Sequence, residues 1–141
     1  GALTFDAAER ALMVPTHKWS NLWGIPGGKI KWAEPSVAAL QRALRATPHL
    51  EVADIEFVLV QDCIHSKEFY RDAHFVLLNY TCKAVGRRPV KLNEEAREFR
   101  WSSLQEAMAL PLNQPTRRLL EAVLQARGGA CRPAPKVVPQ S

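Results

Sequence analysis

The sequence predicts one α/β domain in which a helix lies between strands and further helices close the chain. Residues 55–60 and 73–82 are rich in β-forming residues, and a polar segment separates them as in a hairpin. Between residues 35 and 47, apolar residues recur at helical spacing. The chain has 141 residues, 47% hydrophobic and 23% charged, which suits a single core. Because two strands follow each other directly, the sheet cannot be all-parallel.

The first segment predicts a hairpin followed by irregular chain. Residues 3–5 and 11–14 are apolar and flank a short polar stretch, which is typical of two strands joined by a short loop. Residues 16–23 are polar apart from two tryptophans, and we expect a partly exposed loop. Gly and Pro residues are dense between positions 24 and 28, which predicts that no regular element passes through them.

A helix is predicted from Pro35 to about residue 47. Proline is favoured in the first turn of a helix because its nitrogen needs no hydrogen bond there. Val37, Leu40 and Leu44 then recur at i, i+3 and i+7 and form one apolar face. Pro48 is expected to end the helix.

The second half predicts a short strand and two helices. Residues 99–101 form the expected strand. Ser102 or Ser103 can cap a helix over residues 104–109, with Glu106 placed for a capping box. A final amphipathic helix follows, with apolar residues at positions 119, 120, 123 and 124. Residues 128–141 hold two Gly and three Pro without helical or strand periodicity, and we expect no regular structure there.

The net charge of +5 is concentrated at the end of the chain. Three basic and no acidic residues occur from residue 127 onward, which leaves 16 basic against 14 acidic residues before it. We therefore expect a folded domain over residues 1–126 and a flexible basic tail over residues 127–141. A nucleic-acid-binding domain would rest on the pI alone, so it ranks last among the hypotheses.

Cysteine usage and hydropathy narrow the protein class. The three cysteines are an odd number, lie far apart and show no C-x-x-C spacing: Cys63, Cys82 and Cys131. This pattern predicts neither a disulfide framework nor a zinc site, and it favours reduced thiols and a cytoplasmic location. No apolar run approaches the ~18 residues of a membrane-spanning helix. The chain begins at Gly1, without Met and within an expected strand, so we expect a piece of a longer protein.

The most informative motif begins in the glycine-rich loop. Gly28 and Glu34 are separated by five residues, and Glu34 and Arg42 by seven. This spacing resembles the signature of the Nudix hydrolases, G-x5-E-x7-R-E-U-x-E-E-x-G-U, where U is a bulky aliphatic residue. Leu44 and Leu50 fall on the two aliphatic positions. The resemblance covers roughly residues 1–125.

The resemblance implies a fold and a reaction. The expected fold is a mixed β-sheet flanked by helices, an α/β/α sandwich, with the helix from Pro35 beside the ligand cleft. The implied reaction is hydrolysis of a nucleoside diphosphate linked to another moiety, with Mg²⁺ or Mn²⁺ as cofactor. Glu34 is the implied metal ligand and, with Arg42, a catalytic residue. Glu94 or Glu95 matches the region of a further catalytic glutamate, unless these acids are only solvated surface. Nudix domains also often form homodimers.

The chain departs from the signature at its three later glutamates. These positions hold Ala43, Ala46 and Thr47. Carboxylates on one helical face neutralise the charge of a divalent cation, and here that face is small and nearly apolar. Two hypotheses follow: an active diphosphohydrolase, or a non-catalytic Nudix domain that binds a nucleotide or a protein without a metal. Arg42 then pairs with Glu34, binds a phosphate or lies on the surface.

Residues before and within the glycine loop are candidates for contact with a nucleotide-like small molecule. An aromatic ring can stack on a base, and lysine can meet a phosphate. For the tryptophans, including Trp32, ordinary packing is the favoured interpretation over stacking on a ligand or covering a partner. The predicted substrate-binding residues are Lys18, Trp19, Trp23, Gly27, Gly28 and Lys29.

Overall fold

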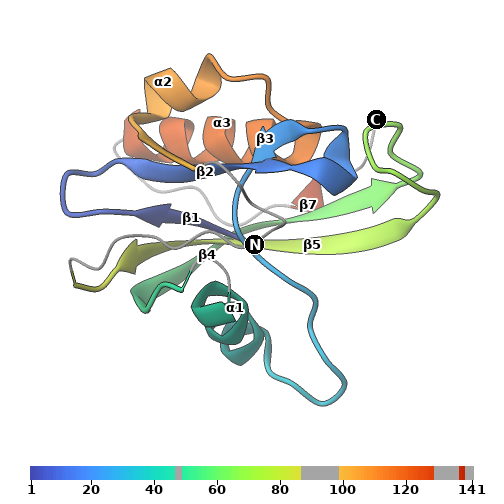
Figure 1. The fold of residues 1–141 in the computed structure, drawn as a ribbon, viewed down its shortest axis with the longest axis horizontal. Helices are drawn as coiled ribbons and strands as arrows, with labels where there is room; N and C mark the ends of the chain where they lie inside the picture. The colour runs from blue at the N-terminus through green and yellow to red at the C-terminus, as the bar shows by residue number, and fades with distance from the viewer. Residues whose placement is uncertain (47–48, 87–98, 129–136, 139–141) are drawn as a thin grey trace.

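A mixed β-sheet forms the middle layer of the structure, a computed structural model that describes residues 1–46, 49–86, 99–128 and 137–138 (Figure 1). The strand order is β3-β2-β1-β5-β4-β7, and β6 pairs with β2. The strands are β1 (Ala2–Phe5), β2 (Ala11–Thr16), β3 (Leu22–Gly24), β4 (Val52–Ile64), β5 (His74–Ala84), β6 (Arg100–Ser102) and β7 (Val137–Val138). The helices are the 3-10 turn η1 (His17–Trp19), α1 (Ser36–Ala46), α2 (Leu104–Met108) and α3 (Gln114–Gly128).

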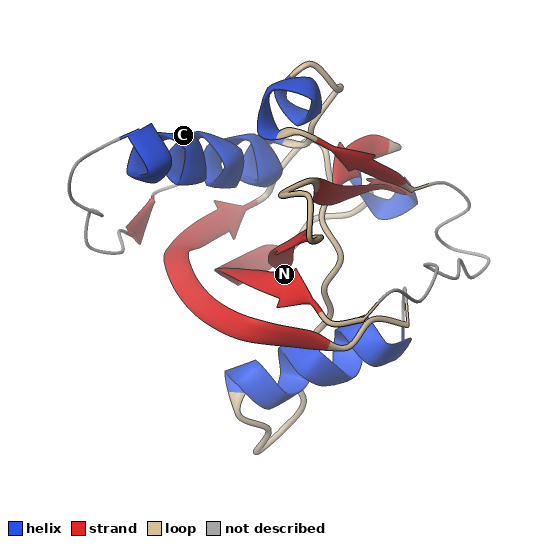
Figure 2. Ribbon diagram, turned by 90° about the vertical axis from the view of Figure 1, so that its left-hand side faces the viewer, coloured by secondary structure: helices blue, strands red, loops and turns tan. Residues whose placement is uncertain are grey.

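Helices cover both faces of this sheet, so the predicted α/β/α sandwich is confirmed (Figures 1 and 2). On one face, Leu40 and Leu44 of α1 pack with Tyr80 and Cys82 of β5. On the other face, α2 and α3 bury their apolar sides against β1 and β2; the buried residues of this cluster are Leu3, Phe5, Ala11, Met13, Leu104, Ala107, Leu112, Leu119, Leu120 and Val123. None of the helices in the described residues is both long and apolar enough to cross a membrane.

The predicted hairpin of residues 55–60 and 73–82 is confirmed and is longer than expected. Strands β4 and β5 pair antiparallel from Val52 opposite Ala84 to Ile64 opposite His74. Strand β1 then joins β5 in parallel, which makes the sheet mixed. The hairpin therefore supplies surface for both helical layers.

The expectation of irregular chain over residues 16–28 was wrong in part. Residues 17–19 form η1, and Leu22–Gly24 form β3, which pairs antiparallel with β2. The reason is long-range: the Trp23 amide donates to the carbonyl oxygen of Pro111 at 2.8 Å, and the Asn113 amide donates to that of Trp23 at 3.0 Å. Such partners, about ninety residues away, leave no signal in local composition.

The expectation of no regular structure after residue 127 was also wrong in part. Helix α3 includes Gly128, and Val137–Val138 form β7, which pairs in parallel with Val60 and Gln61 of β4. The unpaired edge of β4 offers backbone hydrogen bonds that any short extended segment can use. Proline and glycine content therefore did not prevent pairing at these two residues.

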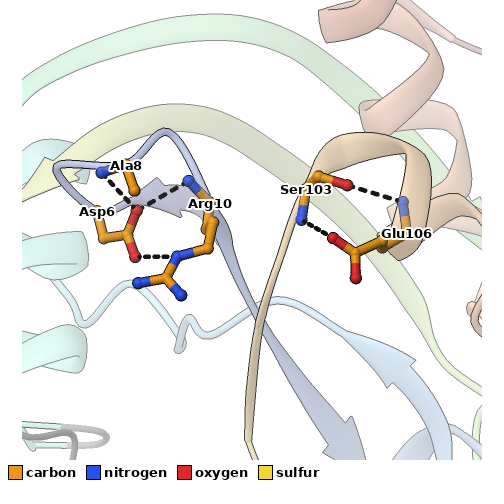
Figure 3. Close-up of polar contacts among 5 residues, drawn as sticks. All are labelled: Asp6, Ala8, Arg10, Ser103 and Glu106. Atoms are coloured by element: carbon orange, nitrogen blue, oxygen red, sulfur yellow. Dashed lines mark hydrogen bonds and ion pairs between the residues drawn. The ribbon is translucent and has the colours of Figure 1, made fainter.

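Two local hydrogen-bond motifs hold the loop between β1 and β2 and the first turn of α2 (Figure 3). In the loop between β1 and β2, the Asp6 carboxylate accepts from the amides of Ala8 and Arg10 and pairs with the Arg10 guanidinium at 2.9 Å. At the start of α2, the Ser103 hydroxyl accepts from the Glu106 amide at 3.1 Å, and the Glu106 carboxylate accepts from the Ser103 amide at 3.2 Å. The predicted capping box is therefore confirmed with Ser103 as the cap.

We expect Ser103→Ala to lower the free energy of unfolding by about 1 kcal/mol, because the first turn of α2 loses an acceptor for a backbone amide. Chemical denaturation measures this change. The matched control is Gln105→Ala, which changes an exposed residue in the same turn of α2. It should change stability by less than about 0.5 kcal/mol. Equal stability of the two variants would show that the box contributes nothing.

Candidate functional site

An ion pair between Glu34, near the end of the β3–α1 loop, and Arg42 of α1 holds this loop. Arg42 of α1 donates from Nε to Glu34 Oε2 at 2.8 Å and from Nη2 to Glu34 Oε1 at 3.0 Å. The same Nη2 donates to the carbonyl oxygen of Lys29 at 2.7 Å. The planar guanidinium matches a carboxylate in this two-bond geometry. The predicted pairing of Arg42 with Glu34 is thus the arrangement that the structure contains.

Backbone bonds complete this arrangement around the Glu34 carboxylate. The Lys31 amide donates to Glu34 Oε1 at 3.0 Å, and the Glu34 amide donates to the Lys31 carbonyl at 3.0 Å. Between them, Ala33 has a φ of 61°, the left-handed region that a non-glycine residue adopts at a cost of about 1 kcal/mol or more. The surrounding hydrogen bonds stabilise this strained turn.

The pair sets the charge state of Glu34. The hydrogen bond from Arg42, followed by that from the Lys31 backbone, lowers the pKa of the Glu34 carboxyl from 4.5 to about 2. Hydrogen bonding to Glu34 raises the pKa of Arg42 correspondingly. Both groups are therefore charged at neutral pH, and each is neutralised by the other.

The glycine loop approaches α1 closely at the first missing glutamate position. A Cβ atom on Gly28 would lie 3.0 Å from the Cβ of Ala43, which is 7% exposed. A Cβ on Gly27 would lie 2.6 Å from the Cα of Gly1, so that position also requires glycine. Close packing of backbone and a methyl group thus occupies the place where the signature has a carboxylate.

The described residues around this loop do not by themselves form a site for a divalent cation. Among the residues that the structure describes, no three His, Cys, Asp or Glu side chains are grouped for metal binding. Glu34 carries the one carboxylate of the predicted metal site, and Arg42 and Lys31 already use both of its oxygens. In proteins Mg²⁺ is held by one or two carboxylates together with waters and substrate phosphates, and Ala43 and Ala46 supply no oxygen ligand.

The other predicted site residues fall on two different parts of the molecule. Lys18 and Trp19 lie on η1, beside the tip of the β4–β5 hairpin, where the Tyr70 amide donates to the Lys18 carbonyl at 2.8 Å. Trp23 lies on β3; it packs against the α2–α3 core, and the Arg100 guanidinium lies 5.3 Å from its ring centroid. The described contacts of Trp23 are those of a packed side chain.

A cluster at the hairpin tip was missed by the sequence analysis. We call Trp19, Phe69, Tyr70 and Phe75 the tip cluster; successive ring centroids lie 4.8 Å apart for Trp19 and Phe69, 4.8 Å for Phe69 and Phe75, and 4.9 Å for Phe69 and Tyr70. The segment from residue 66 to 72 was read only as a polar separator between strands. The sequence signal for the tip cluster is the adjacent pair of aromatic residues at positions 69 and 70, because a solvated turn does not need aromatic side chains.

Trp32 contradicts the packing interpretation. It lies at the outer part of the glycine loop and is 98% exposed, beside Ile30, which is 49% exposed. The bonds of Arg42 and Glu34 hold the loop on either side of Trp32, and the indole does not pack against the hydrophobic core.

Thr47, Glu94 and Glu95 lie outside the described residues, and their predicted roles stay predictions.

We expect Arg42→Gln to raise the pKa of Glu34 from about 2 toward its ordinary value of 4.5. The lowered pKa means that the pair stabilises the fold fully above pH 4.5 and that this contribution is lost as the pH falls toward 2. Titration of the Glu34 side chain by NMR measures the shift. Arg45 lies on the same helix as Arg42 and forms an exposed pair with Glu51, so Arg45→Gln should leave the Glu34 pKa unchanged. An unshifted pKa of Glu34 in the Arg42 variant would refute the assignment.

We expect Trp32→Ser to change the free energy of unfolding by less than about 0.5 kcal/mol, because an exposed indole contributes little burial. Denaturant unfolding of both proteins checks this. Leu44→Ala, in the buried face of α1, is the contrasting variant and should cost about 2–5 kcal/mol. A loss of similar size for Trp32 would mean that the side chain is packed in solution.

Solved structures share this fold at low sequence identity. A MutT NUDIX hydrolase from Burkholderia pseudomallei is 23% identical, with a TM-score of 0.71 over 85% of this chain and 93% of that one. The NUDIX domain of NrtR from Shewanella oneidensis, complexed with ADP ribose, is 20% identical, with a TM-score of 0.70 over 88% and 83%. An Ap4A hydrolase binary complex from C. elegans is 13% identical, with a TM-score of 0.69 over 92% and 97%.

These identities establish the fold alone, and the family follows from the sequence model. A search of curated proteins gave no match. The family model of the NUDIX domain matches residues 1–123, which include strands β1 to β6, α1, α2, most of α3 and the glycine loop. This chain therefore belongs to the NUDIX family.

Proposed function

We propose that this chain is a Nudix domain that binds a nucleoside diphosphate linked to another moiety and does not hydrolyse it through a bound metal. The observation that carries the proposal is the Glu34–Arg42 pair beside Ala43. The pair satisfies both oxygens of the carboxylate, and the neighbouring helical position is a buried methyl group.

The ligand class is inferred from relatives and from the loop. One structural neighbour is described as a complex with ADP ribose and another as an Ap4A hydrolase, both of which point to nucleotide-like ligands. The retained glycines keep the loop close to α1, and the pair with Arg42 keeps it ordered. Retention of this frame after loss of the carboxylates supports binding as the remaining function.

Hydrolysis is the second candidate, favoured by the intact spacing of Gly28, Glu34 and Arg42. In this case Glu34 and either Glu94 or Glu95 would be catalytic, and Mg²⁺ or Mn²⁺ would be the cofactor. A metal site of this kind would have to draw its ligands from residues 87–98 as well as from the loop. The two candidates differ in their dependence on metal.

We expect binding of ADP-ribose or ADP that persists in EDTA, together with no product above that of a Glu34→Gln control when Mg²⁺ or Mn²⁺ is present. Titration calorimetry measures binding, and phosphate or AMP release over a panel of nucleoside diphosphate derivatives measures turnover. Metal-dependent turnover that Glu34→Gln abolishes would establish the hydrolase instead.

A gain-of-function variant completes this test. Glutamates at positions 43, 46 and 47 should create an affinity for Mn²⁺ that the parent chain lacks, because they restore the charge of the helical face. Calorimetry with Mn²⁺ alone checks this, with unfolding curves as a control for the buried position 43. Equal affinity of parent and variant would mean that these positions do not determine metal binding.

A further inference from the structure

The tip cluster brings together aromatic rings that belong to none of the hydrophobic core clusters among the described residues. Trp19 comes from η1, Phe69 and Tyr70 from the hairpin tip, and Phe75 from β5. Trp19, Phe69 and Phe75 are half-buried, whereas Tyr70 is 61% exposed. The cluster therefore presents aromatic surface to solvent at one end of the sheet.

Cationic residues of the hairpin tip and of η1 lie beside Tyr70. Arg71 donates from Nε to this hydroxyl at 3.1 Å, and its guanidinium carbon lies 5.7 Å from the ring centroids of both Phe69 and Tyr70. The hydrogen bond from Arg71, and then the charges of Arg71, Lys18 and Lys29, lower the pKa of Tyr70. We call Lys18 and Arg71, which the hydrogen bonds of η1 and the hairpin tip bring close to Tyr70, the cationic rim.

The nearby carboxylates do not neutralise this rim. Glu68 Oε1 accepts from the backbone amide of Gln114 at 2.8 Å, at the start of α3. Asp72 is exposed and lies 3.9 Å from His65. The described contacts thus place Arg71 on the phenol and Lys18 on the adjoining turn, without a carboxylate bonded to either side chain, and such a grouping favours an anion.

Backbone hydrogen bonds hold the rim in place. The Tyr70 amide donates to the Lys18 carbonyl, and the Ser20 hydroxyl donates to the Glu68 carbonyl at 2.6 Å, so η1 and the hairpin tip form one surface (Figure 1). A site held in this way loses little entropy when a ligand binds.

We propose that the cationic rim and the Tyr70 hydroxyl bind the phosphates of the ligand, and that the tip cluster supplies the aromatic surface for its base. The inference rests on the proposed function and names its phosphate site. Charged ammonium and guanidinium groups and a phenolic hydroxyl are donors suited to phosphate oxygens. They would supply here the positive charge that a metal supplies in a site with several carboxylates.

The test compares single charge removals on the same surface. Lys18→Gln and Arg71→Gln are titrated with ADP in EDTA by calorimetry, with Lys67→Gln as the matched control. Lys67 is an exposed cation of the same hairpin tip and lies outside the rim. We expect each rim variant to weaken ADP binding about tenfold or more, because a charge-assisted bond to phosphate is lost. The control should stay within about twofold of the parent chain.

Inorganic pyrophosphate and adenosine separate the two halves of the site. We expect pyrophosphate to bind with the same dependence on the rim, and adenosine to bind more weakly than ADP and without that dependence. Unfolding midpoints confirm that each variant is folded. If the parent binds ADP and both rim variants bind it within about twofold, the inference is wrong and the proposed function stands. If the parent binds ADP-ribose but neither ADP nor pyrophosphate, the inference is wrong and the proposed function stands. If it binds none of the three, both are wrong.

Discussion

The pairing of β4 with β5 is the constraint on which the rest of the structure depends. These two strands supply the surface on which α1 packs from one side, and β4 contacts α3 on the other. Strand β1 pairs in parallel with β5 and brings the β1–β2 hairpin into the same sheet. The turn between them reaches η1 and the start of α3, so one antiparallel pairing determines both the core and the position of the tip cluster.

The glycine loop is ordered although three glutamates of the signature are absent from this chain. Arg42 and Glu34 make a two-bond ion pair, and Arg42 also binds the Lys29 carbonyl. These contacts order the loop without any of the three missing glutamates. A small residue at position 43 also packs against Gly28 without burying a charge. These contacts between protein groups hold the loop against α1.

Sequence reasoning succeeded where the controlling contacts are local. The capping box at Ser103 and Glu106 and the helix from Pro35 were predicted because each depends on residues three to eight positions apart. It failed at β3, where the amide of Trp23 bonds to Pro111, and at Val137–Val138, which pair with β4. It also placed Trp32 in a packed environment, because exposure of a single side chain is not encoded in local periodicity.

The sequence by itself determined the family, the glycine loop and the loss of the carboxylate face, because spacing along one helix fixes which side chains share that face. Only the tertiary structure decided which residues from distant segments meet at the tip of the β4–β5 hairpin. Lys18 and Arg71 lie in two separate segments, and both lie beside Tyr70 because the hairpin tip hydrogen-bonds to η1. Contacts between distant segments depend on how strands pair and pack, and a single sequence contains no local signal for that pairing.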